Sequence, residues 1–281
     1  MAIRLGCHLW SFGGCTVAEA AAITCALGIT CLDLGNGRDF DPAYIAAHRH
    51  EEAERMLRIR QEIGIEFVDC FPQVSEGGLP FTNNHPDPAV RERYREIWRS
   101  FFPFAAEIGL HGVTFSPGRY WKGESQQASF DRGVAELRWA VDEGTKYGLM
   151  VRIEPHIESI TWRPELVLEM VEAVPGLSLT LDHSHFIFHA LPYEQIAVMH
   201  PYGSHWHARQ ARSGLAQSRG PAGEIDFARI VEELRERQYQ GVICLEYVHG
   251  GWLNQDNVDC ISETVALRQV LQTLLAETLA S

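Results

Sequence analysis

Four short apolar runs in the second half of the chain each lead into a residue of a type that binds metal ions. The runs are rich in β-prone residues, and the stretches between them are long enough for a helix and two loops. This rhythm is typical of βα units that feed strands into a parallel sheet. The residues that close the four runs are Glu154, Asp182, His207 and Glu246. If the four strands are adjacent, these side chains lie together at the carboxyl ends of the strands.

The same alternation of strand-like and helix-like segments extends over the whole chain. We predict strands over residues 3–9, 29–34, 65–71, 111–116, 149–154, 177–181, 202–207 and 242–246. We predict helices over residues 17–27, 42–63, 89–108, 125–147, 164–174, 192–200, 225–238 and 257–280. Eight alternations without a linker predict a single domain over residues 1–281, folded as a (β/α)8 TIM barrel of the α/β class. A doubly wound open sheet is the alternative, although residues 8–12 lack the Gly-rich turn that such folds usually carry.

Local signals mark several boundaries of these elements. Thr16 followed by Glu19 predicts a capped helix start, and Gly28 and Gly64 predict helix ends. Pro103 predicts a kink or a boundary inside the helix over 89–108. The polar loop over 72–88 is long enough to be a lid over a site.

Two glutamates, one aspartate and one imidazole form a hard, oxygen-rich ligand set. Such a set favours Mn²⁺ or Mg²⁺, and Zn²⁺, Co²⁺ and Fe²⁺ are also compatible with it. Without a cation, convergent acidic groups repel one another and are costly to desolvate. We therefore predict one divalent metal ion held by Glu154, Asp182, His207 and Glu246.

The segments around these residues resemble the sugar phosphate isomerase/epimerase family of xylose isomerase-like TIM barrels. They read EPH at 154–156, DHSH at 182–185, HWHAR at 205–209 and LEY at 245–247. The resemblance covers the chain in length and strand rhythm, and it is specific in the second half. It implies the same four metal ligands, with His207 rather than His205 as the imidazole ligand. It also implies a metal-dependent isomerase or epimerase that abstracts a proton next to the carbonyl of a keto-sugar and stabilises an enediolate on the metal.

The resemblance assigns further roles to residues near the strand ends. Glu154 and Glu246 resemble the acid/base pair of the family, and His185 is the next catalytic candidate. The expected substrate-binding residues, including aromatic side chains that could stack on a sugar, are His8, Trp10, His156, Arg209 and Trp121. Each also has a structural interpretation, because Arg209 could form a salt bridge to Glu154 or Glu246, and aromatic residues are often core.

Two departures from the family pattern leave alternatives open. The ketose 3-epimerases carry a Gly-Glu-x-Asn-Arg run after the metal-binding histidine, whereas this chain reads ARQAR at 208–212. A lyase resembling inosose dehydratase would begin with the same enolate, and a sugar-binding barrel without activity is a third interpretation. The endonuclease IV branch needs additional metal ligands and a basic DNA groove, which this sequence does not offer.

The charge balance limits the class of partner. The formal net charge is −13, which argues against nucleic acid because phosphate contacts need clustered Lys and Arg. The sequence shows no signal peptide and no apolar run of transmembrane length, so we expect a cytoplasmic protein without membrane contact. The expected partner is a small sugar or sugar-derived molecule. A homo-oligomer is compatible with the sequence, which does not fix the oligomeric state.

Overall fold

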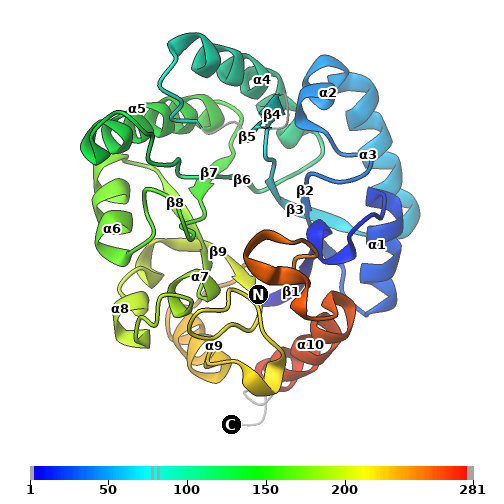
Figure 1. Cartoon of the computed structure of the whole chain (residues 1–281). Helices are drawn as coiled ribbons and strands as arrows, with labels where there is room; N and C mark the ends of the chain where they lie inside the picture. Colours follow the sequence, from blue (N-terminus) through cyan, green and yellow to red (C-terminus); the bar gives the residue numbers. More distant parts are fainter. Residues whose placement is uncertain (1–2, 77–78, 81–82, 277–281) are drawn as a thin grey trace.

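The computed structural model describes residues 3–76, 79–80 and 83–276, and it contains a barrel of eight parallel strands (Figure 1). Neighbouring strands follow the order β3-β2-β1-β10-β9-β8-β7-β6. The backbone N–H of His111, just before β6, donates to the carbonyl of Val68 in β3 at 3.1 Å and so joins the two ends of the sheet. The strands are β1 (Arg4–His8), β2 (Cys31–Gly35), β3 (Glu66–Phe71), β6 (Gly112–Phe115), β7 (Met150–Ile153), β8 (Ser178–Asp182), β9 (Gly203–Ala208) and β10 (Val242–Leu245). The predicted (β/α)8 fold class is confirmed.

Helices surround the barrel and cover the outer faces of the strands (Figure 1). Both faces of the sheet are therefore buried, which explains why the strands are rich in apolar residues apart from the polar groups in the barrel interior. The main helices are α1 (Val17–Ala26), α2 (Pro42–Ala47), α3 (Arg49–Ile63), α4 (Pro88–Glu107), α5 (Gln126–Thr145), α6 (Pro164–Ala173), α8 (Tyr193–Ala197), α9 (Phe227–Glu236) and α10 (Cys260–Ala276). Shorter elements are η1 (Leu9–Phe12), β4 (Ser75–Glu76), β5 (Leu79–Pro80), α7 (Ser184–Ile187), η2 (His200–Tyr202), η3 (Gly220–Ala222) and η4 (Trp252–Asn257).

Several local predictions can be compared with the structure. Thr16 and Glu19 form the expected capping box at the start of α1. Gly64 ends α3 in the left-handed conformation, with φ 79°, which glycine adopts without a Cβ penalty. Of the kink or boundary predicted at Pro103, the boundary was wrong, because α4 continues through the proline to Glu107. The buried aromatic residues that flank Pro103 offset the one hydrogen bond that the proline removes.

The boundaries differ most where short elements interrupt a long pattern. The predicted helix over 42–63 is two helices, because His48 adopts a non-helical backbone (φ −123°, ψ 33°) and stacks on Tyr44. The predicted helix over 192–200 is shorter, since α8 gives way to η2. The final helix begins at Cys260, after η4, and its predicted residues 277–280 lie outside the described residues. The loop over 72–88 contains the antiparallel pair β4–β5. None of the helices in the described part of the chain is long and apolar enough to cross a membrane.

A closed polar network fills the barrel interior one level below the strand ends. Arg152 of β7 forms an ion pair with Asp69 of β3 at 3.0 Å and donates to Ser204 at 2.7 Å. The hydroxyl of Thr114 donates to Asp69 and lies 2.6 Å from the hydroxyl of Thr180. Because side chains alternate along a strand, residues two positions further along point inward one level higher. This network therefore lies directly beneath Glu154 and Asp182, and its polar groups are hydrogen-bonded to one another.

Candidate functional site

The carboxyl ends of four adjacent strands bring Glu154, Asp182, His207 and Glu246 together. Asp182 closes β8 and stands opposite His207 in the register of β8 and β9. The two glutamates extend their strands by one residue, since each backbone N–H donates to a carbonyl of the neighbouring strand at 3.0 Å. All four residues are at most 3% exposed. The adjacency expected from the sequence is present.

The imidazole of His207 lies between the two glutamates. Its Nδ1 atom is 2.6 Å from Oε1 of Glu154 and 3.2 Å from Oε2 of Glu246. These distances allow a proton on Nδ1 to be shared between the imidazole and a carboxylate. Both carboxylate oxygens of Glu246 are buried and have no hydrogen-bond partner among the described residues. A buried carboxylate without such a partner is costly unless a cation or a ligand satisfies it.

Arg209 lies among the predicted ligands rather than free in the cavity. Its Nη2 atom is 2.9 Å from Oδ2 of Asp182 and 3.1 Å from Nε2 of His185, and its Nε donates to the hydroxyl of Ser184 at 2.9 Å. Its Nη1 atom is 3.7 Å from Oε2 of Glu246. The guanidinium therefore serves as a buried counter-charge for these carboxylates.

The environments of the two glutamates separate their acidities. Burial, together with the charge of Glu246, raises the pKa of Glu154 to about 7. Burial acts in the same direction on Glu246, but His207 and Arg209 outweigh it and lower the pKa of Glu246 to about 2. Burial lowers the pKa of His207, yet the neighbouring carboxylates outweigh it and hold that pKa well above its usual value. Such divergent acidities of close groups are common at functional sites.

Buried donor atoms at the base of the cavity form triads that could each hold a divalent cation, and the four predicted ligands are divided between two of them. One donor atom each from Glu154, Asp182 and His185 lies within 4.8 Å of the other two, and so do donor atoms of His8, His207 and Glu246. Carboxylate oxygens and one or two imidazole nitrogens suit the Mg/Mn/Zn group of ions. The identity of the ion is not fixed by this set.

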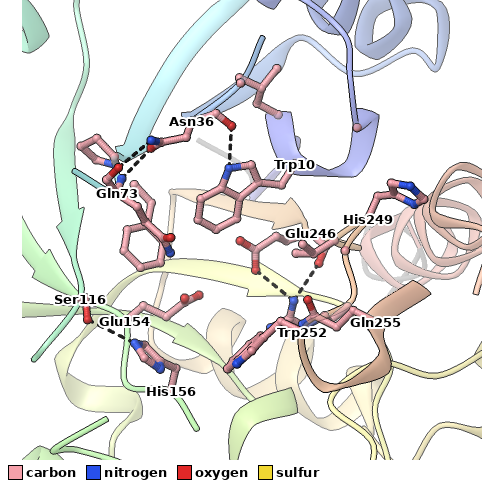
Figure 2. A pocket seen from close by; sticks show the side chains of 18 of the residues that line it. Trp10, Asn36, Gln73, Ser116, Glu154, His156, Glu246, His249, Trp252 and Gln255 are labelled. Atoms are coloured by element: carbon pink, nitrogen blue, oxygen red, sulfur yellow. Dashed lines mark hydrogen bonds and ion pairs between the residues drawn. The ribbon is translucent and has the colours of Figure 1, made fainter. Parts of the chain in front are cut away.

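A cavity of about 640 Å³ opens above the cluster (Figure 2). Glu154, Glu246, His185, Arg209 and His156 form part of its wall. In the view of Figure 2, the two glutamates lie between the indoles of Trp10 and Trp252. Further lining residues include Phe71, Asn36, Gln73, Ser116, Glu158, His249 and Gln255. The cavity thus has a polar base and aromatic walls, as small-molecule sites generally have.

The other predicted substrate-binding residues occupy different positions. The indole N–H of Trp10 donates to the carbonyl of Asn36 at 2.9 Å, which fixes the ring in the cavity wall. His8 is fully buried, 4.4 Å from the ring centre of Trp10, and does not line the cavity. Trp121 also lies outside the cavity lining, because its indole N–H donates to Asn84 at 3.1 Å and its ring packs against His85.

Sequence reasoning missed Asp33 and treated its partner His205 only as an alternative metal ligand to His207. His205 Nε2 lies 2.5 Å from Oδ2 of Asp33, and that same oxygen is 3.3 Å from Nε2 of His207. Asp33 could have been recognised in the sequence, because it is a charged residue inside the apolar run CLDLG at 31–35. Glu158 was also missed, although it lines the cavity with a left-handed backbone, φ 65°.

Comparison with known proteins identifies the fold family. A sequence model of the xylose isomerase-like TIM barrels matches residues 18–269. The chain belongs to this family. No protein of curated function matches the sequence.

Solved structures similar to this xylose isomerase-like barrel share its fold at low sequence identity. A D-psicose 3-epimerase determined with D-fructose has a TM-score of 0.77 and 14% identity, covering 97% of this chain and 99% of that chain. A 3-keto-D-glucoside 4-epimerase from E. coli has a TM-score of 0.73 and 14% identity, with 96% and 99% covered. A xylose isomerase-like barrel from Mycobacterium smegmatis in complex with magnesium has a TM-score of 0.71 and 15% identity, with 98% of each chain covered.

Proposed function

We propose that this xylose isomerase-like barrel is a divalent-metal-dependent isomerase or epimerase of a keto-sugar. The observation that carries the proposal is the arrangement of Glu154 and Glu246 on either side of His207 at the base of the cavity. The sugar epimerases among the similar structures support the same class of reaction.

The metal would be held by Glu154, Asp182, His207 and Glu246, with His185 beside them. When bound, a divalent ion supplies Lewis acidity toward a carbonyl oxygen and neutralises the convergent carboxylates. The magnesium present in one similar structure is consistent with such an ion. The buried carboxylate of Glu246, which has ion-pair contacts with His207 and Arg209 but no hydrogen-bond partner among the described residues, supports such an ion.

In the metal-free protein the two glutamates differ in acidity. Among the protein's own groups, Glu154 has a pKa of about 7 and so can hold or release a proton near neutral pH. Glu246, with a pKa of about 2, stays ionised. A carbon acid next to a carbonyl could lose its proton to one carboxylate and regain it from the other, on the opposite face of the substrate. Return to the opposite face inverts that carbon, which is epimerisation, and return to the neighbouring carbon is isomerisation.

The cavity favours a neutral sugar over a sugar phosphate. Arg119 and Arg209 are the only Lys or Arg side chains among its described lining residues, and Arg209 is already paired with Asp182. Phosphate recognition generally uses a bidentate arginine or a cluster of donors. The indoles of Trp10 and Trp252 instead offer apolar surfaces for the faces of a sugar ring.

A direct assay tests this proposal. Protein stripped with chelator and reloaded with Mn²⁺ or Mg²⁺ is incubated with neutral ketoses and 3-keto-glycosides, and the products are followed by NMR. We expect at least one keto-sugar to be converted to an isomer, with activity lost on chelation and restored by metal. Loss of water from the sugar would assign a lyase, and tight sugar binding without conversion would assign a binding protein.

A further inference from the structure

The two ring nitrogens of His207 face different carboxylates in the barrel interior. Nδ1 faces Glu154 and Glu246, and Nε2 lies 3.3 Å from Oδ2 of Asp33. If Nδ1 binds the ion of the proposed function, its lone pair must be free, and the ring proton must reside on Nε2. A carboxylate next to Nε2 accepts that proton in a hydrogen bond and thereby selects this tautomer.

Asp33 is itself held by a second imidazole. His205 Nε2 lies 2.5 Å from the same Oδ2 atom, and both residues are almost completely buried. His205 and His207 are two residues apart on β9, so both side chains point into the barrel, whereas the intervening Trp206 packs outside. Asp33 reaches them from β2, three strands away around the barrel, since β1 and β10 lie between β2 and β9.

Burying the carboxylate of Asp33 in the barrel interior is energetically unfavourable. A buried carboxylate costs free energy even when hydrogen bonds satisfy it, and Oδ1 of Asp33 has no hydrogen-bond partner among the described residues. The nearby Asp69 is also buried but has the guanidinium of Arg152 as counter-charge. The ion-pair partners of Asp33 among the described residues are the two imidazoles of β9.

We propose that Asp33 and His205 are positioning residues that fix the orientation and tautomer of His207 for metal binding. This inference rests on the proposed function, because it takes Nδ1 of His207 as a metal ligand. In this arrangement Asp33 accepts a hydrogen bond from each ring, and His205 keeps the carboxylate turned toward His207. Metal affinity should therefore depend on two residues that do not touch the ion.

The test measures metal affinity rather than turnover. Titration calorimetry with Mn²⁺ compares the unaltered protein with Asp33→Asn, His205→Ala and His205→Gln, and circular dichroism checks that each variant is folded. We expect Asp33→Asn and His205→Ala to weaken binding by about 10- to 100-fold, the usual effect of removing an outer partner of a metal-bound histidine. His205→Gln, whose amide N–H can donate to Asp33, should recover part of the loss. Asp39→Asn, a partly exposed aspartate that pairs with Arg55, is the control and should leave the affinity unchanged.

A second readout reports the tautomer itself. In Zn²⁺-loaded, ¹⁵N-labelled protein, long-range ¹H–¹⁵N NMR should show the proton of His207 on Nε2, and the Asp33→Asn variant should lose that preference. Affinity within twofold of the unaltered protein in folded Asp33→Asn, or metal bound through Nε2, would overturn the positioning role while leaving the proposed function standing. Failure of the unaltered protein to bind metal would overturn both.

Discussion

His207 Nδ1 lies 2.6 Å from Oε1 of Glu154, a contact that joins the ends of β7 and β9 across the top of the barrel. Both groups are buried, so whatever occupies the space between them interacts without screening by water. In the protein alone a proton takes that place. In the proposed enzyme a divalent cation replaces it, and the following predictions test that exchange.

The cluster should bind one divalent ion per chain. Elemental analysis of protein purified without chelator, or reconstituted with Mn²⁺, should give about one ion of the Mg/Mn/Co/Zn/Fe group. Asp182→Ala should lose both the ion and the activity. The variant removes one ligand of the ion and also the carboxylate that pairs with Arg209, which would then be free to pair with Glu246. Asp39→Asn, a partly exposed aspartate that pairs with Arg55, is the control and should keep the ion. Three ions per chain, or none after reconstitution, would contradict a single site.

The two glutamates should be needed for turnover more than for substrate affinity. Glu154→Gln and Glu246→Gln keep the side-chain shape but remove the charge that accepts a proton. We expect kcat to fall by about two to four orders of magnitude in each variant, the scale for losing a general base, with a much smaller change in KM. Metal content is measured in parallel, so that lost metal is not mistaken for a lost base. Near-normal kcat in both variants would move the acid/base role to His185.

Metal binding should release protons, and affinity should rise with pH. The pKa of Glu154 is raised to about 7 and that of His207 lies well above its usual value, so both groups carry protons in the metal-free protein below neutral pH. A cation must displace these protons, which means that affinity increases as the pH rises through about 7. The free energy of unfolding of the metal-free protein should change with pH in the opposite direction to metal affinity. A carboxyl group whose pKa is raised in the folded state contributes stability that is lost as the pH rises through that pKa.

Calorimetry of Mn²⁺ binding in two buffers of different ionisation enthalpy measures this proton release. The observed heats at pH 6.5 should differ between the buffers by an amount that corresponds to at least one proton. Equal heats in both buffers, or an affinity that does not change with pH, would show that the site binds metal without displacing protons.

The aromatic wall should determine substrate affinity. Trp252 is 44% exposed at the cavity rim, and its ring packs edge-on against His156. Trp252→Ala should raise KM for the best keto-sugar by about fivefold, since one stacking surface is worth roughly 1 kcal/mol, and should change kcat little. Trp121→Ala is the matched control, because Trp121 lies outside the cavity lining. An equal rise of KM in Trp121→Ala and Trp252→Ala would contradict a role of the Trp252 ring in stacking on the substrate.

The sequence predicted the barrel and the four convergent residues for the same reason. Each strand is a short apolar run with a polar residue at its carboxyl end, and parallel strands place those ends at one rim. The pairing of Asp33 with His205 could not be predicted this way, because it joins residues 172 positions apart through side chains that meet in the barrel interior. The helix break at His48 was missed because no Gly or Pro marks it. Trp121 was misjudged as a wall residue because sequence position in a rim loop does not give the direction of a side chain.

Solvent exchange tests the central claim most directly. The metal-loaded protein is incubated in D₂O with ketoses, inososes and 3-keto-sugars, and ¹H NMR and mass spectrometry follow the carbon next to the carbonyl. Proton abstraction by a carboxylate whose proton equilibrates with solvent predicts deuterium at that carbon, together with an isomerised sugar of otherwise unchanged mass. Conversion of a sugar without uptake of deuterium, in both Mn²⁺- and Mg²⁺-loaded protein, would contradict the proton-abstraction mechanism and indicate a hydride shift.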